Sequence, residues 1–233
     1  MSCNRARGSL VWVSGIRRNA SLLLAGLLVA ACQSKDLTDE RLVRFVDEVM
    51  FGGPYDAHIP KDGRVAKWSG DPLVVVTGVN AGEYRSRVST ELERFSILSG
   101  LDARIANTAI PTNLKITFVD SEDFLINREN VPCFAWIQTN SGQIVNVEVQ
   151  LSTVDPDMID RCLSHELMHA FGLRYHSGIV RSVLSSAHTE EHLSPWDELA
   201  IRVLYDTRLH LGAPRATAVP AIREIVSDRI VRP

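Results

Sequence analysis

The stretch HELMHAFGLRYH, residues 165–176, is the most informative part of this chain. It lies in a segment with the marks of a helix, because Asp155 suits the N-cap, Pro156 the first helical position and Gly172 the position just past the end. At about 100° per residue, the apolar side chains of this segment cluster on one side, and the two histidines lie more than about 100° from the cluster centre. We therefore expect a helix whose histidines stand outside its apolar stripe.

His165 and His169 are four residues apart, so on a helix their imidazoles stack on one face and both reach a single metal ion. Glu166 lies beside the pair, where its carboxylate can hydrogen-bond a water molecule at the metal and serve as general base. The pattern indicates metal-assisted hydrolysis. HExxH also occurs by chance, so plain surface histidines are the alternative.

Further helices and strands are predicted outward from this segment. The predicted strands cover residues 73–77, 114–119, 133–138 and 143–151, and the predicted helices begin after Asp39, cover 80–99, begin at Ser194 and cover 219–229. Residues 143–151 alternate between apolar and polar side chains, which favours a strand at a sheet edge with one wet face. The order of elements predicts an α+β domain with a central sheet over residues 41–233.

The N-terminus is typical of an export signal. Residues 1–19 hold four arginines and no acid, residues 20–31 are almost wholly apolar, and Val29-Ala30-Ala31-Cys32 resembles the lipobox of bacterial lipoproteins. We expect residues 1–32 to be a lipoprotein signal with lipidation at Cys32, and residues 33–40 to be a tether. That places the domain on the periplasmic face of the cell envelope, at the outer membrane, with the membrane reached through the lipid alone. An ordinary cleaved signal or an uncleaved anchor helix is the alternative.

Charge and cysteine content narrow the partners and the fold. Without residues 1–31, the chain keeps 25 − 4 = 21 basic against 28 acidic side chains, a net charge of −7 that argues against nucleic acid as partner. Cys133 and Cys162 remain after removal of the signal and lipidation of Cys32. In an oxidising compartment we expect a disulfide between them, with two buried thiols as the alternative.

Residues 165–176 resemble the long zinc-binding motif of the metzincin metallopeptidases, in which a glycine three residues after the second histidine lets the chain turn back toward a third. Residues 181–185 resemble the Met-turn of that family, and residues 193–197 the start of its C-terminal helix. The resemblance implies a small mixed sheet, a zinc-binding helix and C-terminal helices, with the strand 143–151 as the edge that binds a peptide or protein substrate. It also implies Zn²⁺ held by His165, His169 and His176, with Glu166 as the catalytic base.

Two positions depart from the metzincin pattern. The third ligand is expected at position 175, which is Tyr175, so His176 comes one residue late and the loop would have to bulge. Leu184 stands in place of the methionine of the Met-turn. Two functions follow: a zinc peptidase of the cell envelope, or a metzincin-like binding or scaffolding lipoprotein with weak or no catalysis.

The chain also resembles a family of bacterial exported domains of unknown function, with which it shares the cysteine before the helix, the Gly-Leu after it and the Leu-Tyr-Asp of residues 204–206. The other histidines have no predicted role. His188 and His192 are four apart but lie in an acidic loop, which favours solvation, and His58 and His210 have no predicted partner.

Overall fold

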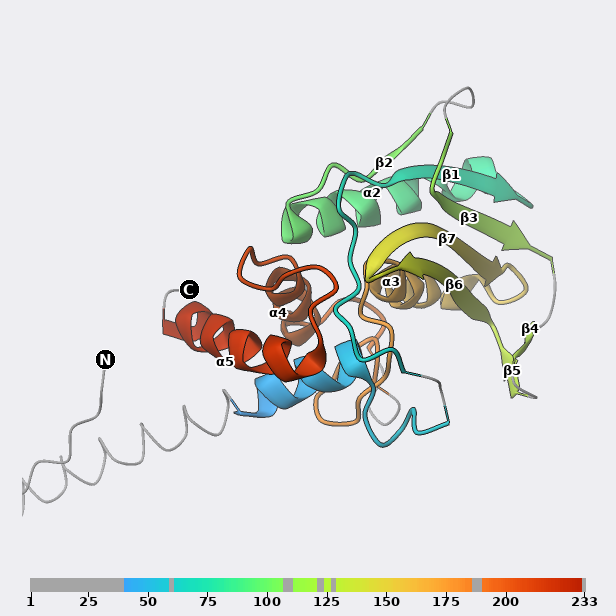
Figure 1. The fold of residues 1–233 in the computed structure, drawn as a ribbon. Helices are drawn as coiled ribbons and strands as arrows, with labels where there is room; N and C mark the ends of the chain where they lie inside the picture. The colour runs from blue at the N-terminus through green and yellow to red at the C-terminus, as the bar shows by residue number, and fades with distance from the viewer. Residues whose placement is uncertain are drawn as a thin grey trace, which may run out of the picture. The chain divides into compact units, whose positions relative to one another are not determined.

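A five-stranded mixed sheet lies at the centre of the computed structural model (Figure 1). Its strand order is β2-β1-β3-β7-β6, in which β6 alone runs antiparallel to its neighbour. The strands are β1 (Leu73–Gly78), β2 (Arg104–Ile105), β3 (Leu114–Val119), β6 (Cys133–Asn140) and β7 (Gln143–Ser152). A separate antiparallel pair is formed by β4 (Phe124–Ile126) and β5 (Glu129–Val131).

The structure describes residues 40–58, 61–106, 111–120, 124–126, 129–185 and 190–231. They belong to one compact unit, Asp39–Pro233. The predicted signal, the lipobox with Cys32 and all of the tether except Glu40 lie outside the described residues. Within the described residues, no helix combines the length and the apolar composition needed to cross a bilayer.

The described residues form five helices besides the sheet, which confirms the predicted α+β class. The first covers residues 40–51, and the others are α2 (Ala81–Ser99), α3 (Ile159–Ala170), α4 (Pro195–Leu204) and α5 (Arg215–Val231). A 3₁₀ turn, Pro156–Met158, precedes α3, and the Asp155 carboxylate caps it by accepting the N–H of Asp157. The helix 40–51 lies beside α5 (Figure 1), where Asp47 pairs with Arg215 at 2.6 Å. The last helix begins four residues earlier than predicted.

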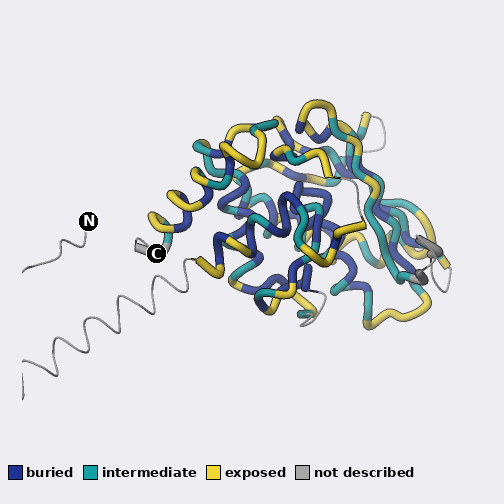
Figure 2. The backbone as a smooth tube through the Cα atoms, turned by 60° about the horizontal axis from the view of Figure 1, so that its bottom comes forward, coloured by how far each residue is buried: buried dark blue, intermediate teal, exposed yellow. Residues whose placement is uncertain are grey.

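One face of the sheet packs against α2 and α3 and forms the core (Figures 1 and 2). Ile116, Phe118, Val149 and Leu151 are fully buried, and the ring of Phe118 stacks on Tyr84 of α2. The alternate side chains of these strands are half-buried or exposed. Burial of one face follows from the period of two along a strand.

The predicted place of the strand 143–151 at the sheet edge is wrong. This strand, β7, lies between β3 and β6, and β6 forms the edge. An alternating pattern shows only that one face of the sheet contacts solvent. An interior strand has the same pattern as an edge strand when the sheet is covered on one side. On the edge strand β6, Trp136 is 56% exposed.

A disulfide joins the edge strand to the histidine-bearing helix. Cys133, the first residue of β6, is bonded to Cys162 of α3, with 5.8 Å between the Cα atoms. The predicted bridge is thus confirmed. It fixes α3 three residues before His165.

Candidate metal centre

The two histidines of α3 are held by carbonyl oxygens. His165 Nδ1 lies 2.7 Å from the Val183 carbonyl oxygen, and His169 Nδ1 lies 2.7 Å from that of Leu173. Because a carbonyl oxygen can only accept, both Nδ1 atoms carry the proton. The lone pair of each neutral ring is therefore on Nε2.

His176 comes from the loop after α3 and is held by a buried carboxylate. Asp56, 1% exposed, accepts the main-chain N–H of His176 at 2.8 Å with Oδ2 and its ring Nδ1–H at 3.1 Å with Oδ1. Both oxygens of Asp56 are thus directed at one residue. The third ring accordingly also presents Nε2 on its free side.

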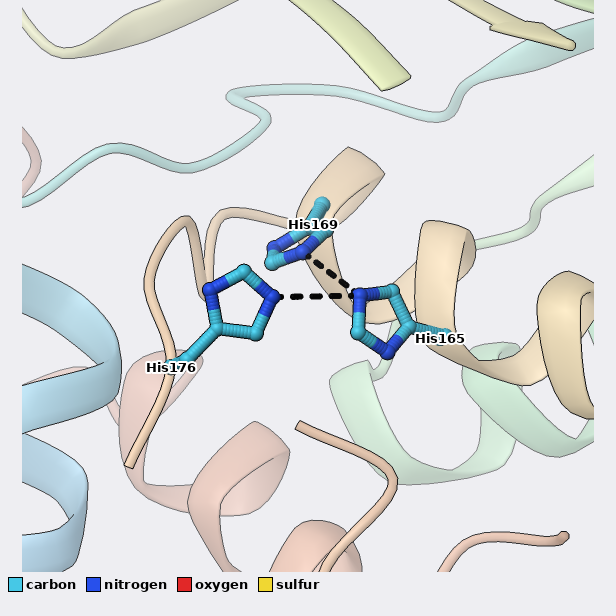
Figure 3. Close-up of side chains that lie close together, drawn as sticks. All are labelled: His165, His169 and His176. Carbon is cyan, nitrogen blue, oxygen red and sulfur yellow. Dashed lines mark hydrogen bonds between the residues drawn. The ribbon is translucent and has the colours of Figure 1, made fainter. Parts of the chain in front are cut away.

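The three Nε2 atoms meet at one point (Figure 3). His165 Nε2 is 3.1 Å from His169 Nε2 and 3.3 Å from His176 Nε2, and the ligand atoms of all three lie within 4.8 Å of one another. With each proton on Nδ1, these contacts set lone pairs face to face, which is unfavourable unless a cation lies between them. Nitrogen ligands at about 2.0–2.1 Å around a tetrahedral ion are roughly 3.3–3.4 Å apart, so the two distances from His165 Nε2 are close to those around such an ion. In metal sites, the ring N–H of a histidine that does not face the metal usually donates a hydrogen bond to a carbonyl or carboxylate oxygen, as it does in all three residues here.

Burial lowers the pKa of both imidazoles on α3 and so keeps them neutral. Burial and the nearby His176 together lower the pKa of His165 to about 4. Burial also lowers the pKa of His169 well below its ordinary value, with His165 and His176 adding to the effect. Neutral imidazole is the form that binds metal. His165, His169 and His176 can therefore hold a metal ion.

The loop after α3 explains why position 176, and not 175, supplies the third imidazole. Gly172 has φ +112°, and a Cβ there would lie 2.1 Å from the Ala66 carbonyl oxygen, so the turn needs glycine. Tyr175 is buried away from the cluster, and its N–H donates to the Val49 carbonyl oxygen at 3.0 Å. Tyr175 packs into the interior, and the following residue then points at the helix.

Glu166 is buried beside the cluster. It is 3% exposed, and its Oε2 has no hydrogen-bond partner among the described residues. Burial raises the pKa of this carboxyl to about 8. Glu166, His165 and His176 line a cavity of about 410 Å³, whose walls are the start of α3, Val131–Cys133 and the turn at residues 55–58. Glu166 therefore belongs to the cavity wall beside His165.

A second buried aspartate supports the turn beneath His165. Asp197, fully buried at the start of α4, accepts the Ser182 hydroxyl and the N–H of Val183, whose carbonyl oxygen holds His165. Burial raises the pKa of Asp197, although these donors oppose the rise. Leu184, in place of the expected methionine, is fully buried.

Sequence reasoning did not identify Asp56 or Val183 as supports of the centre. Asp56 lies 120 residues before His176, and no local pattern marks it. Of the remaining histidines, His58 lines the cavity. The histidine cluster found in the described part of the chain does not include His58, His192 or His210. His188 lies outside the described residues.

Comparison with known proteins places the chain in a family without a known function. No match to a curated protein is found. The model of one family, described as "Protein of unknown function (DUF2927)", matches residues 39–224 and so takes in the helix 40–51, the whole sheet, α3, all three histidines of the cluster and α4. Because this match covers most of the sequence, the chain belongs to the DUF2927 family.

Proposed function

We propose that this chain is a zinc-dependent peptidase of the cell envelope with a metzincin-like catalytic domain. One observation carries the proposal: three Nε2 lone pairs converge beside Glu166, a buried residue of the cavity wall whose Oε2 has no hydrogen-bond partner among the described residues. A purely structural zinc site is closed by four protein ligands, whereas a hydrolytic site has three and leaves one position open.

The choice of zinc follows from the ligands. Three neutral imidazoles suit zinc, copper, iron or nickel better than calcium or magnesium, which prefer oxygen. Zinc supplies a Lewis acid that polarises a carbonyl group and lowers the pKa of water, without redox chemistry. His165, His169 and His176 would hold it.

The residues of the chain divide the remaining work. Glu166 lines the cavity and its Oε2 has no hydrogen-bond donor in the described part of the chain, so the ionised carboxylate can accept a proton from water and pass it to the leaving amine. Asp56 and the carbonyl oxygens of Val183 and Leu173 fix the rings and keep each proton on Nδ1. The cavity admits a peptide segment beside Glu166.

Metal analysis and one substitution test the proposal. We expect one zinc per purified chain, lost in His176→Ala. Glu166→Gln should keep the zinc and abolish peptide hydrolysis, whereas Glu91→Gln, a control on α2 whose carboxylate accepts the Ser164 hydroxyl outside the cavity, should keep both. A protein without zinc would refute the proposal. Zinc without hydrolysis in the unaltered protein would favour the binding lipoprotein instead.

We also propose that Cys32 carries a lipid that anchors the domain to the envelope, with the domain on the periplasmic side. The sequence before Cys32 supports this, and so does the Cys133–Cys162 disulfide, because such bonds persist in oxidising compartments. Labelling of cells with a radioactive fatty acid should mark the protein and should fail to mark Cys32→Ser. Equal labelling of both would exclude lipidation at this position.

A further inference from the structure

Arg161 lines the cavity that holds Glu166 and His165. It is the third residue of α3, half-buried, and four residues before His165. Residues four apart on a helix are neighbours on one face, about 5–6 Å apart at Cβ. Arg161 therefore belongs to the same wall of the cavity as His165, one helical turn away.

No group in the described part of the chain forms an ion pair or a hydrogen bond with the guanidinium of Arg161. The adjacent Asp160 pairs with Arg87 of α2 at 3.2 Å. The carboxylate of Asp56, which also lines the cavity, accepts hydrogen bonds from His176 with both oxygens. A half-buried guanidinium that has no ion-pair partner among the described residues is unusual, because five N–H donors then lose part of their hydration without compensation.

Its place on the helix makes this cation still less favourable for the free protein. Arg161 lies in the first turn of α3, where the helix dipole presents partial positive charge and favours anions. The side chain thus contributes nothing evident to the stability of α3. An anion that enters the cavity would relieve both costs.

We infer that Arg161 binds a carboxylate of the substrate, so that the peptidase selects acidic peptides. This inference rests on the proposed function. Arginine recognises carboxylates through two parallel hydrogen bonds, and such charge-assisted pairs are the strongest available at a site of this kind. An extended peptide advances about 3.4 Å per residue, so a carboxylate one helical turn from the metal centre lies within about two residues of the scissile bond.

Two sources could supply that carboxylate: an Asp or Glu side chain, or the free C-terminus of the peptide. Randomised eight-residue peptides with acetylated and amidated ends separate them from a matched set with free C-termini. In the amidated set, we expect the zinc-loaded protein to cleave next to Asp or Glu, with at least about a tenfold advantage in kcat/KM over Asn or Gln. Cleavage confined to the last two residues of the free set would assign the terminal carboxylate instead.

Substitution of the arginine tests its role directly. Arg161→Gln should remove the acidic preference, Arg161→Lys should retain part of it, and Arg161→Glu should shift it toward Lys and Arg. Arg202→Gln is the matched control, because Arg202 is a half-buried arginine of α4 that does not line the cavity. Cleavage with no acidic preference, or a preference that survives in Arg161→Gln, overturns the inference and leaves the proposed peptidase intact.

A binding measurement decides the inference even if no peptide is cleaved, an outcome that would count against the peptidase itself. The side-chain Nε–H NMR signal of Arg161, assigned by its loss in Arg161→Gln, is followed during titration with N-acetylglutamate amide or N-acetylglutamine amide. The glutamate derivative should move this signal and the glutamine derivative should not. Equal responses to both would overturn carboxylate recognition.

Discussion

The most direct test of the metal centre is Asp56→Asn, which alters the support of the third imidazole without touching a ligand. Asp56 accepts two N–H groups of His176, one with each carboxylate oxygen, at 2.8 and 3.1 Å. Asparagine keeps one oxygen and presents an NH₂ group in place of the other. Whichever way the amide turns, one N–H of His176 then faces another donor.

The magnitude follows from the burial of this contact. Asp56 is 1% exposed, so water cannot replace the lost acceptor, and a buried unpaired donor costs about 1–3 kcal/mol. Loss of the acceptor that holds the ring N–H of a histidine ligand lowers metal affinity by roughly 10- to 100-fold, or about 1.4–2.7 kcal/mol. We therefore expect Asp56→Asn to fold, with reduced stability, and to bind zinc 10- to 100-fold more weakly.

Competition with a colorimetric zinc chelator measures this affinity. The matched control is Asp62→Asn, because the Asp62 carboxylate holds the same loop through Arg174, at 2.6 and 3.0 Å, without contact to an imidazole. This control should lose no more than about 1 kcal/mol of stability and keep its zinc affinity within about twofold. Equal zinc affinities in Asp56→Asn and the unaltered protein would refute the assigned role of Asp56.

Three further predictions concern the stability of the folded domain. Gly172→Ala should lose roughly 2–4 kcal/mol of stability in denaturant titration, because φ is +112° and the new Cβ would lie 2.1 Å from a carbonyl oxygen; an unchanged midpoint would contradict this account of the turn. Replacement of both Cys133 and Cys162 by serine should cost about 3–4 kcal/mol, since the bridge spans 29 residues, and a thermal melt that matches the bridged protein would argue against it. The hydrogen bond from Arg208 lowers the pKa of Asp206 to about 2 from 3.8, so its stabilising effect is complete above about pH 4 and is lost as the pH falls toward 2. In Asp206→Asn, the loss of folding stability between about pH 4 and pH 2 should be smaller by roughly 1 kcal/mol, after allowance for solvent screening. Identical acid titrations of the two proteins would count against this prediction.

Local features of the fold could be predicted from the sequence alone. The spacing of His165, Glu166 and His169 predicts a helix face that could hold a metal ion, because the helical period fixes which side chains are neighbours over one turn. Caps and turns are local for the same reason, so the helix starts at Asp155 and Ser194 could be predicted from a few residues each. The disulfide followed from cysteine content and needed no geometry.

The third imidazole of the candidate metal centre and the carboxylate that holds it depend on contacts between distant segments. Packing of Tyr175 into the interior turns His176 toward the helix, and the carboxylate that holds its ring comes from 120 residues earlier in the chain. The edge strand is β6 and not β7. Alternation along a strand indicates which face of the sheet contacts solvent, and it carries no information about the neighbouring strands. Contacts between distant segments depend on how whole elements pack, and local residue patterns do not encode that packing.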